Sequence, residues 1–191
     1  MALLGCAGFI LLFLADYNDF KLKNGPLKLC FPAGIVLLTV STVILSYKSY
    51  TAGGYSVNPQ RIIFFAAALF FFLLIIYTLF FAIPAKESYT MPGTGRRVCK
   101  AGVYALCRHP GVIWFIFMYV SLCMSVGFPV YCAAVFSALN LLLIVFEDNV
   151  VFPALLDGYR GYKEETPFLI PNLDSIKKCV SFYAGAQASK R

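Results

Sequence analysis

Charged side chains are scarce in this sequence. Only 13% of its 191 residues are Asp, Glu, Lys or Arg, whereas 60% are hydrophobic. A soluble domain carries about 25% charged residues. The composition therefore excludes an ordinary soluble domain and indicates that lipid surrounds much of the chain. The length fits a single domain.

Lysine and arginine outnumber the acids, but they do not cluster. The formal net charge is +7, from 16 basic and 9 acidic residues. The basic residues are spread over short loops between apolar runs, with no interleaved aromatic platform, so the sequence excludes a nucleic-acid binder. Basic residues that flank apolar spans instead act as topology determinants beside an anionic membrane surface.

Histidine and paired cysteines are also lacking. His109 is the single histidine, and the seven cysteines form no C-x-x-C pair and no ligand cluster around it. Several cysteines lie in apolar runs, where cysteine behaves as a small hydrophobic residue. We therefore predict neither a metal site nor a disulfide framework. No basic segment precedes the first apolar stretch and no cleavage site precedes Asp16, so no secretory signal is predicted.

Long apolar runs replace the missing charges. A helix needs about 20 residues to cross about 30 Å of hydrocarbon. Residues 62–83 reach this length without a charge, between Arg61 and Pro84, and residues 29–47 nearly do so. The opening run, residues 2–15, is shorter than a full span and crosses only with minimal tilt. These runs predict three transmembrane helices in the N-terminal half.

The next apolar run, residues 111–146, is uncharged over 36 residues. As one helix it would be roughly 54 Å long, well beyond the thickness of a bilayer. Gly127-Phe128-Pro129 lies near its middle, and glycine after one helix followed by proline in the first turn of the next is typical punctuation. We therefore predict a tight helical hairpin with arms 111–127 and 128–146.

The predicted fold is thus an all-α integral membrane protein with about five transmembrane helices, the last two forming the hairpin. The positive-inside rule places the N-terminus outside and the C-terminus in the cytoplasm. Small size and five spans suit a prokaryotic inner membrane. The basic residues behind this orientation lie in loops 16–28 and 84–110: Lys21, Lys23, Lys28, Lys86, Arg96, Arg97, Lys100 and Arg108.

The tail after residue 146 is mixed in charge, with six basic and six acidic residues and with Pro153, Pro167 and Pro171. It is too polar to span, so we expect a C-terminal segment of short helices at the cytoplasmic interface. Residues 1–191 then form a single membrane domain. Its N-terminal part, residues 1–97, holds three helices and their loops, and residues 172–191 are the cytoplasmic tail.

A hairpin returns its two ends to one side of the membrane. Its entrance is Arg108-His109-Pro110 and its exit is Glu147-Asp148, so we expect a cationic pair and an acidic pair at the same cytoplasmic rim. Three interpretations stay open. The charges are boundary markers that snorkel to water, they bind a zwitterionic ligand, or they form a salt bridge that locks the hairpin.

The sequence around this rim resembles a known enzyme family. GVYALCRHPG at residues 102–111, the apolar hairpin, Glu147-Asp148 and a spaced tyrosine segment ending in LIP are similar to the isoprenylcysteine carboxyl methyltransferase and phospholipid methyltransferase superfamily. The resemblance covers about residues 98–171. The matching residues are Gly102, Tyr104, Arg108, His109, Pro110, Glu147, Tyr159, Tyr162, Pro167, Ile170 and Pro171.

The resemblance implies a membrane methyltransferase that uses S-adenosylmethionine, with residues 98–171 as its cofactor-binding core. His109 and Glu147 are the expected catalytic residues. Arg108 suits the carboxylate of the cofactor, and Glu147 suits its amino group or ribose hydroxyls. The expected cofactor-binding residues are Tyr104, Arg108, His109, Pro110, Glu147, Asp148, Tyr159 and Tyr162.

The methyl acceptor stays open among an isoprenylcysteine, a phospholipid headgroup, a small thiol and a quinone-like lipid. A lipid-like acceptor is expected to enter from the membrane, and His109 or an acid of the 147–148 pair to take its proton. The chain departs from the family pattern at Val112, Trp114 and Asp148. These departures concern the acceptor side more than the cofactor side.

Two alternatives come from other classes. Sterol and steroid reductases, which use NADPH, are similar in the same C-terminal layout, but this chain is short for them and shows no basic cluster suited to a 2′-phosphate. The other alternative is a non-catalytic membrane protein in which Arg108 and Glu147 clamp the hairpin.

Overall fold

The computed structural model describes residues 1–82 and 96–188. The chain forms two compact units. Unit 1 comprises Met1–Phe72 and Phe115–Val151, and unit 2 comprises Leu73–Trp114 and Phe152–Arg191. Lys86 and the first part of the predicted 84–110 loop, up to residue 95, lie outside the described residues.

Unit 1 is built from helices. α1 (Ala2–Tyr17) continues into the π-helical turn η1 (Asn18–Leu22), and η2 (Pro26–Leu29) leads into α2 (Cys30–Ala52). The first part of α3 (Pro59–Phe80) and most of α6 (Pro110–Val126) follow. The unit ends with α7 (Val130–Phe146) and the π-helical turn η3 (Glu147–Val151).

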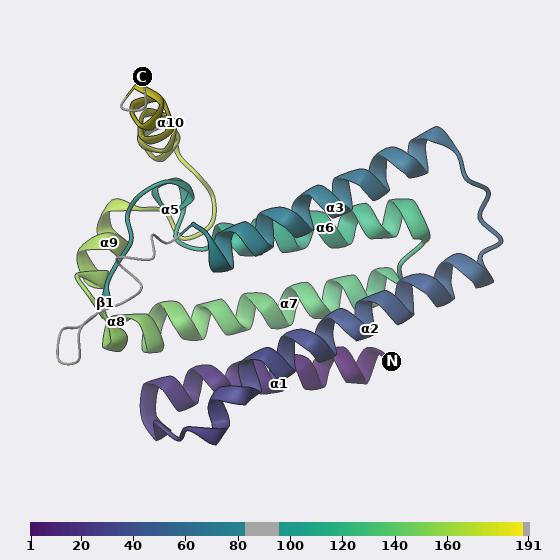
Figure 1. Ribbon diagram of the computed structural model, residues 1–191, viewed down its shortest axis with the longest axis horizontal. Helices are drawn as coiled ribbons and strands as arrows, with labels where there is room; N and C mark the ends of the chain where they lie inside the picture. The colour runs from purple at the N-terminus through teal and green to yellow at the C-terminus, as the bar shows by residue number, and fades with distance from the viewer. Residues whose placement is uncertain (83–95, 189–191) are drawn as a thin grey trace. The chain divides into compact units, whose positions relative to one another are not determined.

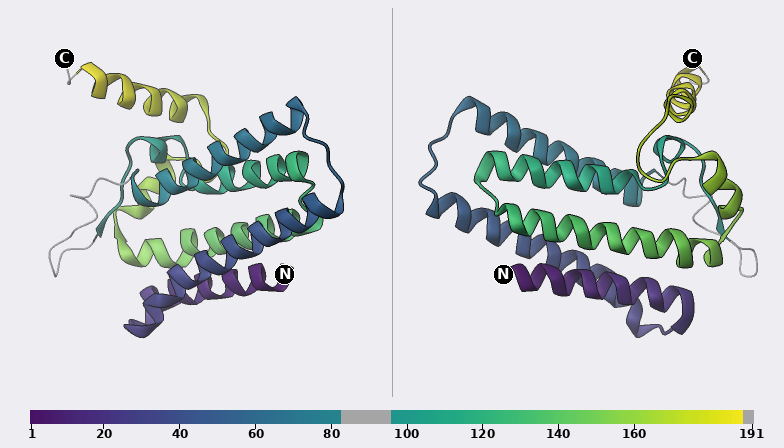
Figure 2. Two further views of the ribbon diagram at one scale, coloured as in Figure 1. Left: turned by 45° about the vertical axis from the view of Figure 1, so that its right-hand side comes forward. Right: turned by 180° about the vertical axis from the view of Figure 1, so that it is seen from behind.

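Glycines let α1 and α2 pack closely side by side, as Figures 1 and 2 show. A Cβ atom at Gly34 would lie 2.8 Å from the carbonyl oxygen of Gly8, and one at Gly8 would lie 2.9 Å from that of Gly34. Small residues at helix contacts are typical of membrane proteins, where packing holds helices together without a hydrophobic effect between them.

Within residues 1–82 and 96–188, four helical segments are long and apolar enough to cross a membrane: Ala2–Leu22, Pro26–Ala52, Pro59–Phe80 and Val130–Leu155. Pro110–Val126 is a shorter apolar helix. Many large apolar side chains on these helices are exposed, among them Leu3, Ile63 and Leu142. Exposed apolar surface on this scale is typical of a protein surrounded by lipid, and the apolar helices indicate a multi-pass membrane protein.

The predicted hairpin is confirmed within unit 1. Its arms were predicted at 111–127 and 128–146, and the helices run from Pro110 to Val126 and from Val130 to Phe146 (Figure 1). Gly127 has a φ of +70°, a conformation that favours glycine, and Pro129 caps α7. The buried Tyr119 ring packs on Phe128 and Phe136, which fastens the two arms.

The opening helix is longer than the predicted run of residues 2–15. α1 ends at Tyr17, and the π-helical turn η1 continues the helix to Leu22. The reason is local: Asn18 is fully buried, and its side-chain amide exchanges two hydrogen bonds with the backbone of Asn24. These bonds satisfy polar groups where the sequence pattern indicated the end of the helix.

Unit 2 contains the end of α3, the start of α6 and several short elements. α8 (Phe152–Leu155), α9 (Tyr159–Glu165) and α10 (Leu173–Ala188) confirm the prediction of short helices in the tail, and α5 (Val103–Leu106) lies before α6. β1 (Arg96–Arg97) and β2 (Leu156–Asp157) pair in parallel over two residues.

Candidate functional site

The Arg108-His109-Pro110 segment enters α6 in an extended conformation. Gly102 before α5 has φ +61° and ψ −131°, which only glycine adopts readily. Cys107 after α5 is extended, and a residue before proline is held out of the helical region. The chain therefore leaves α5, runs straight past Arg108 and His109, and starts α6 at Pro110.

This extended segment pairs with residues that follow α9. The backbone N–H of Arg108 donates to the carbonyl of Pro167 at 2.9 Å, and that of His109 donates to the carbonyl of Phe168 at 3.3 Å. The two sequence elements behind the family resemblance, Arg-His-Pro and Thr-Pro-x-Leu-Ile-Pro, thus lie directly beside each other in unit 2.

The Arg108 side chain fixes the end of α9. One of its guanidinium nitrogens donates to the carbonyls of Lys163 at 3.0 Å and Thr166 at 2.7 Å. These are carbonyl groups at a helix C-terminus, where a cation is favourable. The guanidinium carbon also lies 5.5 Å from the centre of the Phe168 ring. Arg108 therefore positions the 163–168 segment.

His109 is enclosed by aromatic rings and only 6% exposed. Its ring stacks on Phe152 with centroids 5.9 Å apart at 11°, and meets Phe168 edge-on at 5.1 Å. Phe152 opens α8, immediately after the η3 turn. The imidazole is held in a fixed plane in apolar surroundings, and Pro110 beside it is fully buried.

The three predicted tyrosines stabilise the same region. Tyr162 donates from its hydroxyl to the carbonyl of Tyr104 at 2.6 Å, and Tyr104 donates to the carbonyl of Thr78 at 2.8 Å. Burial raises the pKa of Tyr162, so its hydroxyl keeps the proton that it donates. Tyr159 packs edge-on against Phe152 and Tyr162. These side chains join α3, α5, α8 and α9 within unit 2.

The predicted acidic pair lies in unit 1, at the start of the π-helical turn η3. Asp148 is 2% exposed. Glu147 lies near Asp16, which is in the last turn of α1 just before η1. π-helical turns are frequent at functional sites, and here the two turns η1 and η3 pack together.

Asp16 is a candidate residue that the sequence analysis did not identify. Its signal is an acid at the end of the first apolar run, a pattern that is also typical of the start of a loop. The packing of α1 against α7 then brings it to Glu147. The site thus contains a third carboxyl group next to the predicted pair.

The predicted site residues divide between the two units. Unit 2 brings together Arg108, His109 and Pro110 with the three tyrosines, whereas Glu147 and Asp148 belong to unit 1. The expected meeting of the cationic and acidic pairs joins residues of different units and stays a prediction.

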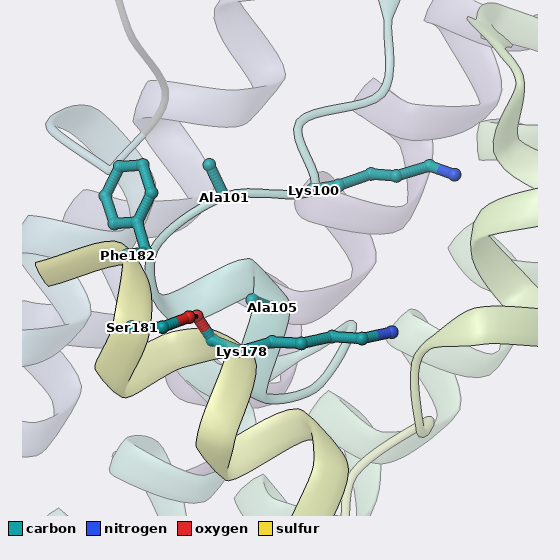
Figure 3. Close-up of a pocket in the computed structure, with 6 residues that line it drawn as sticks. All are labelled: Lys100, Ala101, Ala105, Lys178, Ser181 and Phe182. Carbon is teal, nitrogen blue, oxygen red and sulfur yellow. Dashed lines mark hydrogen bonds between the residues drawn. The ribbon is translucent and has the colours of Figure 1, made fainter. Parts of the chain in front are cut away.

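A separate open cavity of about 390 Å³ lies in unit 2 between the segment around α5 and the helix α10. Figure 3 shows Lys100 and Ala101 from the first, and Lys178, Ser181 and Phe182 from the second. None of the predicted site residues lines this cavity.

Cys107, next to Arg108, is fully buried. Burial raises its pKa to about 11, so little of it is thiolate and it is a poor nucleophile at neutral pH.

Comparison of the chain with family models, curated proteins and solved structures found no significant match.

Proposed function

We propose that the chain is a multi-pass membrane methyltransferase that uses S-adenosylmethionine. The observation that carries the proposal is the docking of the two motif elements on each other, through the backbone bonds from Arg108 to Pro167 and from His109 to Phe168. Residues that are 59 positions apart in the sequence thus form one compact cluster. A cluster of this kind supports a common site for the motif residues.

The side chains suit the cofactor by their chemistry. It carries an α-amino acid zwitterion, a ribose diol and a sulfonium cation, and when bound it supplies an electrophilic methyl group. Arg108 would hold its carboxylate, and Glu147 with Asp148 would accept from its amino group or ribose hydroxyls. The Phe152 and Phe168 rings around His109 supply an apolar wall.

The chain's own residues would act by positioning and by proton transfer. Arg108 holds the 163–168 segment, and the tyrosine bonds hold α5 against α9, so the site is preorganised. His109 or a carboxyl of the Asp16, Glu147 and Asp148 group would take the proton of a thiol or amine acceptor. A lipid-like acceptor would enter from the bilayer and the cofactor from the cytoplasm.

The proposal includes a membrane topology. Five spans would cross a prokaryotic inner membrane, with the N-terminus outside and the C-terminus in the cytoplasm. Pro110–Val126 would be the shortest span, with about 26 Å of helix, which suits a thin or locally thinned bilayer.

Ligand titration of the full chain in detergent tests the function. We expect S-adenosylhomocysteine, but not NADPH, to raise the unfolding temperature. A ligand at 100 times its Kd stabilises the folded state by about 2.7 kcal/mol. His109→Ala and Glu147→Ala are expected to abolish the shift. His109→Phe keeps the ring contacts with Phe152 and Phe168 but removes the ring nitrogens. A lost shift in this variant would therefore come from lost ligand binding and not from lost packing.

The outcome of the titration distinguishes a methyltransferase from a reductase. A shift with NADPH alone would favour a reductase of the sterol or steroid type. Unchanged affinity for S-adenosylhomocysteine in His109→Phe and in Glu147→Ala would overturn the site that we propose.

One observation favours a second candidate, a non-catalytic membrane protein. The Arg108 guanidinium binds the carbonyls at the end of α9, which is a structural role. On this alternative no cofactor binds, and Arg108→Lys lowers the unfolding temperature of the ligand-free protein without any ligand-dependent shift in either form.

A further inference from the structure

The C-terminal helix α10 leaves an apolar stripe uncovered. Ser175 is buried and Cys179 is half-buried, so this side of the helix faces the rest of unit 2. Leu173, Ile176 and Val180 are 76%, 42% and 62% exposed. Their spacing of i, i+3 and i+7 puts them on one face of the helix. We call these three residues the α10 stripe.

A hydrogen bond fixes the depth of α10 relative to the membrane. The hydroxyls of Tyr183 on α10 and Tyr77 on α3 lie 3.1 Å apart. Tyr77 is three residues from the end of α3, a helix long and apolar enough to span, and therefore about 4.5 Å along the axis from that end. Tyrosine is typical of the membrane–water interface. The contact thus holds α10 near the end of a span.

A basic side chain accompanies the stripe. Lys177 is exposed and lies four residues after Leu173 and three before Val180, on the same side of α10 as the stripe. Lys178 instead lines the cavity between α5 and α10 (Figure 3), and Lys100 at the same cavity pairs with Glu165 at 3.0 Å. An amphipathic helix with an apolar face and lysines binds a membrane surface through apolar insertion and attraction to anionic lipids.

We propose that α10 lies on the bilayer surface, with the α10 stripe in the headgroup–acyl boundary and with Lys177 against anionic headgroups. The partner is the lipid surface of the membrane in which the chain is embedded. Three side chains are too few for a stable protein interface, which buries about 1,200 Å² or more. The proposal is independent of methyl transfer, and its experiment measures lipid contact alone.

Fluorescence of the full chain in nanodiscs tests the proposal. In a Trp114→Phe background, Val180→Trp puts the single tryptophan into the stripe, and Ser181→Trp is the control on the adjacent position of the same helix. We compare phosphatidylcholine with a mixture containing phosphatidylglycerol, each with brominated acyl chains. We expect strong quenching at position 180 in the anionic discs and weaker quenching at position 181.

A charge variant tests the role of Lys177. A lysine near an anionic surface favours the bound helix roughly fivefold, so Lys177→Gln should reduce the ratio of bound to free helix by roughly fivefold in anionic discs. Lys21→Gln removes the same charge near the other end of the chain and should leave the quenching unchanged. Hydrogen exchange of the unaltered chain gives a readout that needs no variant. We expect residues 173–188 to exchange more slowly in anionic discs than in phosphatidylcholine discs.

Three results would overturn the proposal. The first is equal quenching at positions 180 and 181. The second is quenching that does not respond to anionic lipid or to Lys177→Gln. The third is emission at position 180 that depends on the number of chains per disc, which would identify a second copy as the partner.

Discussion

At the scale of single residues, the predicted site residues serve two purposes. Arg108 and Tyr162 direct their hydrogen bonds to backbone carbonyls and hold unit 2 together. His109 has its ring packed between two aromatic side chains. Its nitrogens are the groups best suited to chemistry, because the rings around it exclude water and strengthen its electrostatic interactions.

The sequence identified these residue types but not their partners. The Arg-His-Pro motif predicts an extended entry to a helix, because proline restricts the residue before it. The bonds from Arg108 to Lys163 and Thr166 depend on where α9 ends, which is set by packing in unit 2. The approach of Asp16 to Glu147 likewise depends on how α1 packs against α7, so no pattern near Asp16 predicts it.

Cys107 gives a prediction at this scale. Burial disfavours its thiolate and raises its pKa to about 11, so about one in 1,000 molecules carries the thiolate at pH 8. We expect N-ethylmaleimide at pH 8 to leave Cys107 unmodified in the folded protein, as measured by peptide mass spectrometry. Raising the pH toward 11 should increase its labelling, and unfolding in denaturant should restore ordinary reactivity. Labelling of Cys107 in the folded protein at pH 8 as fast as in denaturant would contradict this account.

At the scale of elements, helix ends were predictable where covalent geometry decides them. Gly127 and Pro129 fix the hairpin turn, and the observed arms differ from the predicted ones by at most two residues. The end of the first helix was not predictable in the same way. There the buried Asn18 forms hydrogen bonds with Asn24, and the helix continues through polar residues that are typical of a loop.

The contact between α1 and α2 gives a prediction at this scale. Gly34→Ala places a methyl group against the Gly8 carbonyl oxygen. This oxygen belongs to the helix backbone, so it cannot move aside as a flexible side chain could. Overpacking of this kind costs about 1–3 kcal/mol. We expect a lower unfolding temperature in detergent, and Gly8→Ala should do the same. Gly161→Ala is the matched control, because its Cβ would meet nothing within 4 Å. Equal stability of Gly34→Ala and the unaltered chain would show that the helices do not pack this closely.

At the scale of the whole molecule, composition decided the class and charge placement decides the orientation. A chain with 60% hydrophobic and 13% charged residues cannot cover its apolar surface with polar groups, and the exposed apolar side chains of the long helices agree with this. The basic residues lie mainly in loops 16–28 and 84–110, on what would be one side of a five-span protein. Both loops precede the short apolar helix Pro110–Val126, so the side on which the C-terminus lies depends on whether this helix crosses the bilayer.

Reporter fusions in bacterial cells test this topology. If Pro110–Val126 crosses, the chain has an odd number of spans and its ends lie on opposite sides, so green fluorescent protein at the C-terminus should fluoresce and alkaline phosphatase there should be inactive. Alkaline phosphatase fused after Gly127 should be active, because the hairpin turn would then face the periplasm. Inactivity at Gly127 with fluorescence at the C-terminus would show that the hairpin does not reach the far side. Arg61→Glu is the internal control, since one fewer positive charge on the outer side strengthens the predicted orientation.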